Sequence, residues 1–121
     1  MALTETVIAK LRGLADRQEE LTRLLSDPAI TGNRNQFVEF SREYSELEPL
    51  VTHYQRYEKL ISQLEDASAL TSDADREIQA LAADDIAVLR VEIDDVGRAI
   101  QTLLLPEDPS DGSNVFLEIR A

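Results

Sequence analysis

Apolar residues recur at intervals of three and four along most of this chain, and this spacing restricts its fold more than any other feature. Such spacing places the apolar side chains on one face of an α-helix. It predicts three helices of roughly 22, 34 and 32 residues. At ~1.5 Å per residue they would be about 33, 51 and 48 Å long. Their apolar positions are, in order, Val7, Leu11, Leu14, Leu21 and Leu25; Phe37, Phe40, Tyr44, Leu47, Val51, Tyr54, Tyr57, Ile61 and Leu64; and Ile78, Leu81, Ala82, Ile86, Leu89, Ile93, Val96, Ile100 and Leu103.

Capping residues and prolines predict where these helices begin and end. Thr4 or Thr6 can cap the first helix, which ends at Asp27-Pro28 because proline disfavours helix at the preceding residue. Residues 28–35 are predicted to be a connection. The second helix should run to about Ala69 with a kink at Pro49 rather than a break. The third should begin at Ser72 or Asp73 and stop at Pro106.

Short connections make neighbouring helices antiparallel, so the expected fold is all-α: an elongated, coiled-coil-like three-helix bundle. The two longer helices would project beyond the short one, and their exposed ends make a homodimer possible. Aromatic residues are only 5% of the chain and glycines number four, which argues against a β-sandwich or barrel. Residues 1–105 form the predicted helical domain, and residues 106–121 an extended tail with a strand-like run at 115–120.

The charge balance bears on the partners that the chain can have. Asp and Glu number 24 against 12 Lys and Arg, for a net charge of -12. Direct binding to nucleic acid is disfavoured, because the affinity of proteins for nucleic acid comes mainly from neutralising its phosphates with Lys and Arg. No apolar run is long enough to span a membrane. The strongest acidic concentration is either a binding face for a basic partner or a solvated helix surface; its ten acids are Glu65, Asp66, Asp73, Asp75, Glu77, Asp84, Asp85, Glu92, Asp94 and Asp95.

The residues that could support catalysis do not form a recognisable site. Cysteine is absent, and the single histidine, His53, has Leu50 three residues before it, so the Glu-x-x-His pairs of a di-metal bundle do not occur. His53 is expected to be a partly exposed helix residue. We therefore predict no catalytic residue, no cofactor and no metal. The Leu103–Leu105 run is more apolar than one stripe requires, which suggests contacts on two sides.

Three strings carry a resemblance to a known family. Ser41-Arg42-Glu43-Tyr44, followed by Leu47-Glu48, resembles the second-helix motif of bacterial class I peptide chain release factors. Residues 103–111 (LLLPEDPSD) are similar to the segment that leaves the N-terminal helical domain of that family. Residues 114–121 (NVFLEIRA) are similar to the start of the next domain, and the Glu118-to-Ala121 ending is closest to release factor 1.

The resemblance implies a cytoplasmic protein of translation termination at UAA and UAG. It implies that this helical domain contacts the GTPase-associated centre of the ribosome, near ribosomal protein L11 and the release-factor GTPase. The Pro-x-Thr and Gly-Gly-Gln motifs on which codon reading and hydrolysis depend in the family do not occur in these 121 residues. The expectation is a non-enzymatic N-terminal domain; the alternative is a stand-alone acidic coiled-coil adaptor or dimerisation module.

Overall fold

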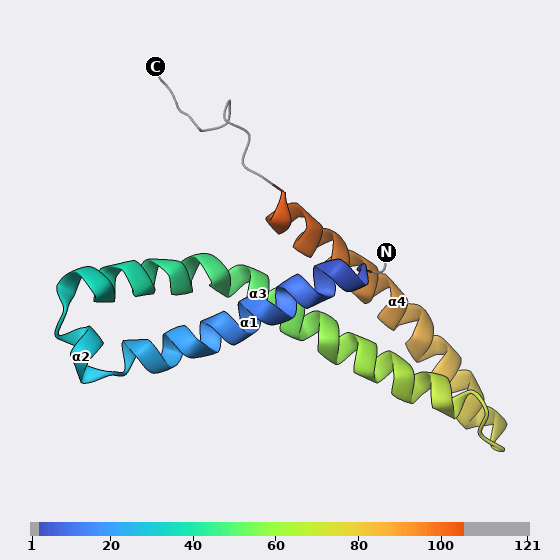
Figure 1. Cartoon of the computed structure of the whole chain (residues 1–121). Helices are drawn as coiled ribbons and strands as arrows, with labels where there is room; N and C mark the ends of the chain where they lie inside the picture. Colours follow the sequence, from blue (N-terminus) through green and yellow to red (C-terminus); the bar gives the residue numbers. More distant parts are fainter. Residues whose placement is uncertain (1–2, 106–121) are drawn as a thin grey trace.

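The structure, a computed structural model, describes residues 3–105 and consists over that range of four helices. They are α1 (Glu5–Leu25), α2 (Pro28–Thr31), α3 (Arg34–Leu70) and α4 (Arg76–Leu104). Helix α3 is the central element, and α1 and α4 each run antiparallel to it (Figure 1). The all-α, elongated bundle predicted from the apolar spacing is therefore confirmed.

Helices α1 and α4 cover different parts of α3. The Arg17 side chain of α1 bonds Glu43 early in α3, whereas Arg56, farther along α3, bonds Glu92 of α4. Backbones of α1 and α4 do not run side by side anywhere in the described range. The molecule thus consists of two antiparallel helix pairs that share α3 and point in opposite directions (Figure 1). The second projecting pair, α1 with the start of α3, was not predicted.

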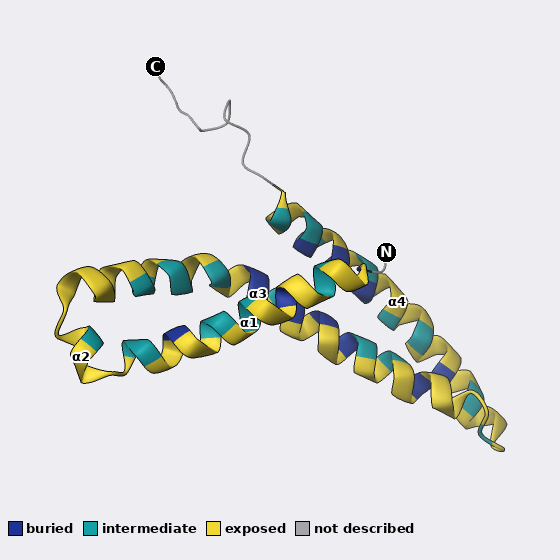
Figure 2. Cartoon of the chain, viewed as in Figure 1, coloured by how far each residue is buried: buried dark blue, intermediate teal, exposed yellow. Residues whose placement is uncertain are grey.

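The core lies where the two pairs meet. Figure 2 shows buried residues on all three long helices in this region. We call this cluster the junction; its buried members are Leu3, Leu11, Leu50, Tyr54, Tyr57, Leu60, Ile93, Val96 and Ile100. The Tyr57 hydroxyl accepts a hydrogen bond of 3.3 Å from the Leu3 backbone N–H, which fastens the start of the chain to α3. Leu3, Leu50 and Leu60 were missing from the predicted stripes.

A capping side chain marks the start of each helix. Thr4 caps α1, as predicted, by accepting from the Val7 N–H at 3.2 Å. The predicted connection at 28–35 is corrected, because it contains the single turn of α2. Asp27 caps that turn through the Ala29 N–H, and Pro28 occupies its first position, where proline lacks only a donor that would be unpaired anyway. The proline that ends α1 therefore also starts α2.

The start predicted for the last helix is also corrected. Its cap is Asp75, which accepts from the Glu77 N–H at 2.8 Å, and not Ser72 or Asp73. Asp73 is used in the preceding turn instead: its carboxylate accepts from the Asp75 N–H at 2.9 Å. Three acceptor side chains within four residues left the sequence ambiguous, and the geometry of the turn selects the last of them.

Helix α3 is continuous through Pro49, as predicted for a kink rather than a break. Its first and second halves run in different directions in Figure 1. Proline removes one backbone donor and crowds the preceding turn, which bends a helix at that point. The Pro49 ring lies on the exposed side, so the bend does not interrupt the junction.

Four residues of the predicted stripes are exposed, which corrects those assignments. Phe37, Ile78 and Leu103 lie toward the ends of the helix pairs, where fewer neighbouring side chains cover them. Leu81 precedes the buried Ala82 and is turned about 100° from it around α4. Periodicity identifies which face of a helix is apolar, but it does not show how far along that face a partner extends. The expected strand at 115–120 and the tail at 106–121 fall outside the described residues.

Candidate functional site

The acidic residues singled out from the sequence gather on one end of the molecule. Glu65 and Asp66 lie in the last two turns of α3, Asp73 and Asp75 lie in the connection to α4, and the other six are on α4. We call this end, the pair formed by the second half of α3 and by α4, the acidic arm. The structure therefore brings the ten acids onto one helix pair, although they do not converge on a single point.

Several of these acids have structural partners. Asp73 and Asp75 form the turn and the α4 cap, and Glu92 pairs with Arg56 at 2.8 Å. Asp95 pairs with Arg98 at 2.9 Å, which also approaches Asp94 at 2.8 Å. These acids stabilise local structure and are partly neutralised. They are weaker candidates for binding than the sequence alone suggested.

Asp84 and Asp85 differ from these acids. Both are exposed on α4, and within residues 3–105 neither forms an ion pair. Asp85 borders a shallow groove of about 370 Å³ between α3 and α4. The other lining residues are Gln63, Val88, Leu89 and Glu92. An open groove with an exposed valine and one carboxylate that forms no ion pair, Asp85, suits contact with another macromolecule better than capture of a small molecule.

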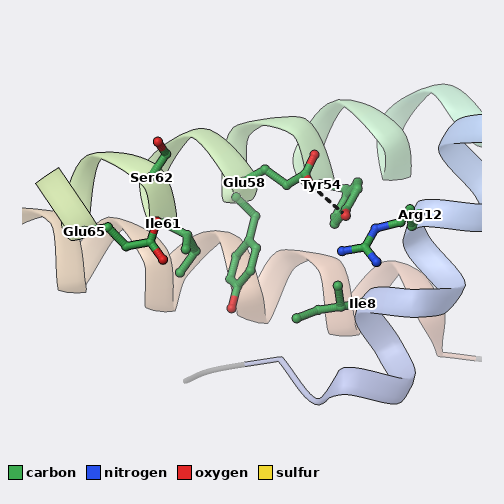
Figure 3. Close-up of a pocket in the computed structure, with 8 residues that line it drawn as sticks. Ile8, Arg12, Tyr54, Glu58, Ile61, Ser62 and Glu65 are labelled. Carbon is green, nitrogen blue, oxygen red and sulfur yellow. Dashed lines mark hydrogen bonds between the residues drawn. The ribbon is translucent and has the colours of Figure 1, made fainter.

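A second hollow, of about 230 Å³, lies between α1 and α3 beside the junction (Figure 3). Its lining residues are Ile8, Arg12, Tyr54, Tyr57, Glu58, Ile61, Ser62 and Glu65. The Tyr54 hydroxyl donates to Glu58 at 2.9 Å, and the Arg12 guanidinium points toward that hydroxyl. Burial raises the pKa of Tyr54, and the bond to Glu58 raises it further, so the phenol stays neutral and acts as a donor.

This hollow does not have the components of a catalytic centre. Its hydroxyls are already bonded within the protein or lie at an exposed edge, and no base activates a nucleophile there. No group of three or more His, Asp or Glu side chains within residues 3–105 is arranged to hold a metal ion. His53 is half-buried, as expected, and its Nδ1 lies 2.7 Å from the Pro49 carbonyl oxygen, to which it donates. That bond ties the ring to its own helix.

The Ser41-Arg42-Glu43-Tyr44 string, which carries part of the family resemblance, contains an inter-helix contact. Glu43 accepts two hydrogen bonds from Arg17 of α1, from Nε at 2.6 Å and from Nη2 at 2.8 Å. Arg17 also bonds Glu20 at 2.6 Å, and its guanidinium lies 5.8 Å from the centre of the Phe40 ring. A planar guanidinium fits a carboxylate in this two-bond geometry, which fixes the register of α1 on α3.

The Arg17–Glu43 pair makes stability depend on pH in a definite direction. Its hydrogen bonds hold the pKa of Glu43 below the usual 4.5, so the pair stabilises the fold above that pH and ceases to do so as Glu43 becomes protonated below it. Glu43→Gln should therefore be less stable than the parent chain at neutral pH and approach it in acid. Urea unfolding at the two pH values measures this difference; an equal difference at both would contradict it. Glu46→Gln, at an exposed position of the same helix, is the control.

The Leu103–Leu105 run has contacts on one side only within residues 3–105. Leu104 packs against the junction, while Leu103 and Leu105 are exposed. The prediction that this run contacts the core on one side is therefore confirmed for Leu104. The contact predicted for its other side stays a prediction. No helix in the described range is both long and apolar enough to cross a membrane.

Comparison with known protein families gives a direct result for this helical chain. Residues 14–121 match the PCRF domain, which covers α1 from its second half onward and all of α2, α3 and α4. No solved structure matches the chain. The PCRF domain is a domain of release factors, which implies a role in translation termination and a general interaction with the ribosome. The chain belongs to the PCRF domain family.

Proposed function

We propose that this chain is the N-terminal helical domain of a type 1 class I release factor, which acts in the cytoplasm at UAA and UAG codons. The family match over residues 14–121 carries the proposal, and the Glu118-to-Ala121 ending supports type 1. In this proposal residues 1–105 are the helical domain, and residues 106–121 are the linker and first strand of the next domain. The helical domain is not an enzyme in this proposal, and it positions a factor whose codon-reading and hydrolytic motifs lie elsewhere.

The partner in this proposal is the GTPase-associated centre of the ribosome, near ribosomal protein L11 and within reach of the release-factor GTPase. The acidic arm supports it, because Asp84 and Asp85 are exposed and have no ion-pair partner in the described range. Free carboxylates at the end of an elongated domain accelerate encounter with a basic partner. The acidic surface also argues against a direct grip on RNA by this domain.

The test of this partner is the binding of the chain to ribosomal protein L11, measured by surface plasmon resonance at several salt concentrations. We expect a salt-sensitive association that slows in Asp84→Asn/Asp85→Asn, because long-range attraction acts mainly on the association rate. Glu46→Gln/Glu48→Gln removes two exposed acids from the first part of α3 and should bind as the parent does. No salt-sensitive binding, or an equal effect of both variants, would exclude this contact.

The nucleotide sequence that follows the Ala121 codon tests the rest of the proposal. A release factor predicts Gly-Thr-Gly-Gly in frame, with Pro-x-Thr and Gly-Gly-Gln motifs farther on. An immediate stop codon would instead favour the stand-alone acidic adaptor. This observation is independent of the binding assay, so the family role and the proposed ribosomal contact are tested separately.

A further inference from the structure

Helix α4 carries a second stripe, made of apolar residues and aspartates, on the side turned away from α3. Its members are Leu81, Asp84, Val88, Val91 and Asp95, spaced by three, four, three and four residues. We call this set the outer stripe. Its apolar members are among the most exposed large apolar side chains in the described range: Leu81 is 64% exposed, Val88 60% and Val91 62%. Figure 2 shows exposed residues along this length of α4.

The outer stripe has the geometry of a helix-packing seam. Its spacing is that of the a and d positions of a heptad, into which the side chains of another helix insert. From Leu81 to Asp95 it extends about 21 Å at ~1.5 Å per residue, which is roughly four turns. The groove between α3 and α4, lined by Asp85, Val88 and Leu89, lies alongside it and offers room for side chains of a docked helix.

Charge identifies the kind of helix that fits. Both polar positions of the outer stripe are aspartates, and Asp85 and Glu92 flank it. Arg98 pairs with Asp95 and Arg56 with Glu92, but Asp84 and Asp85 have no such partner within residues 3–105. A partner helix must therefore bring Lys or Arg beside its own apolar positions, since an uncharged or acidic helix would leave these carboxylates unpaired or repelled.

The same charges disfavour a second copy of the chain as the partner. A symmetric pair joins the same surface on both molecules. In an antiparallel pair centred on Val88, Leu81 would face Asp95 and Asp84 would face Glu92. An apolar residue would then meet a carboxylate, and two carboxylates would meet each other. The homodimer that the sequence left possible is therefore not the complex that this surface favours.

We propose that the outer stripe of α4 is a docking site for a basic amphipathic helix of another protein. Such a helix would bind the acidic arm through apolar and basic side chains, and it need not belong to a ribosomal protein. The peptide assay described next can therefore succeed or fail independently of the L11 assay.

The probe is a labelled synthetic helix of about four turns, with leucines at heptad a and d positions and lysines beside them. Fluorescence anisotropy measures its binding to the 121-residue chain, and a peptide with glutamates in place of the lysines is the control. We expect the basic peptide to bind and the acidic peptide not to bind. Affinity should fall as salt rises, because screening shortens the range of charge attraction.

Two double variants separate the apolar from the ionic contribution. Val88→Ser/Val91→Ser and Asp84→Asn/Asp85→Asn should each weaken peptide binding by about tenfold or more. Val38→Ser, at an exposed apolar position on the opposite helix pair, should leave it unchanged. All three change exposed side chains, so circular dichroism should show unaltered helix content and melting.

Three results would overturn the proposal. The first is equal binding of the basic and acidic peptides. The second is unchanged binding in Val88→Ser/Val91→Ser, which would reduce the interaction to general charge attraction. The third is a dimer, seen by sedimentation of the chain alone, that Val88→Ser/Val91→Ser abolishes; it would make a second copy the occupant.

Discussion

Leu11→Ala is expected to lower the free energy of unfolding by about 2–5 kcal/mol, the range for deleting a buried leucine side chain. Leu11 is only 1% exposed and belongs to the junction, where α1, α3 and α4 contribute to one cluster. Truncation there removes contacts within this cluster and leaves a cavity. Because the junction joins both helix pairs, the whole molecule should become less stable.

Urea unfolding followed by circular dichroism measures this loss, with Leu81→Ala as the matched control. Leu81 undergoes the same truncation at a position that is 64% exposed, so its effect should be within about 0.5 kcal/mol. A similar loss of stability in both variants would mean that the junction is not the main source of stability. It would also mean that Leu81 is covered in solution, as expected if the chain associates through the outer stripe.

Leu21→Ala should cost about as much as Leu11→Ala, about 2–5 kcal/mol, but its effect should be local. Leu21 is fully buried yet lies outside the junction, on the pair formed by α1 and the first half of α3. Since α1 does not run along α4, opening of this pair need not disturb the acidic arm.

Native-state hydrogen exchange distinguishes the two leucine variants. In Leu21→Ala, amide protection should fall in α1 and in the first half of α3, and stay unchanged in the first half of α4. In Leu11→Ala it should fall in all three long helices. A uniform loss in Leu21→Ala would show that the molecule unfolds as one unit and that the two helix pairs are not independent.

The fold was largely predictable because helix periodicity and capping are local properties. Thr4 and the continuity of α3 through Pro49 agree with prediction. The assignments of Pro28 and Leu81, among others, were wrong. Pro28 was interpreted only as a stop, although Asp27 before it makes a helix start as well. Leu81 follows Ile78 at a spacing of three, but it is exposed, whereas its neighbour Ala82 lies on the buried face.

The candidate site was predictable only as a concentration of charge. Sequence counting cannot separate Asp84 and Asp85 from Glu92 and Asp95, whose partners Arg56 and Arg98 are identified by three-dimensional contacts. The role of Glu43 was likewise hidden, because its partner lies 26 residues away on α1. The outer stripe was present in the sequence as a second set of three-and-four spacings, overlooked beside the stronger buried set.

The division of α3 between two partners has a consequence for how the chain folds. Each helix pair joins segments that are consecutive in the sequence, α1 with α3 through α2, and α3 with α4 across five residues. Chains dominated by such local contacts reach the native state quickly, because little loop entropy is lost before contacts form. During synthesis the pair of α1 and the first half of α3 emerges before α4, so it can form first, and the junction is completed when α4 closes on α3.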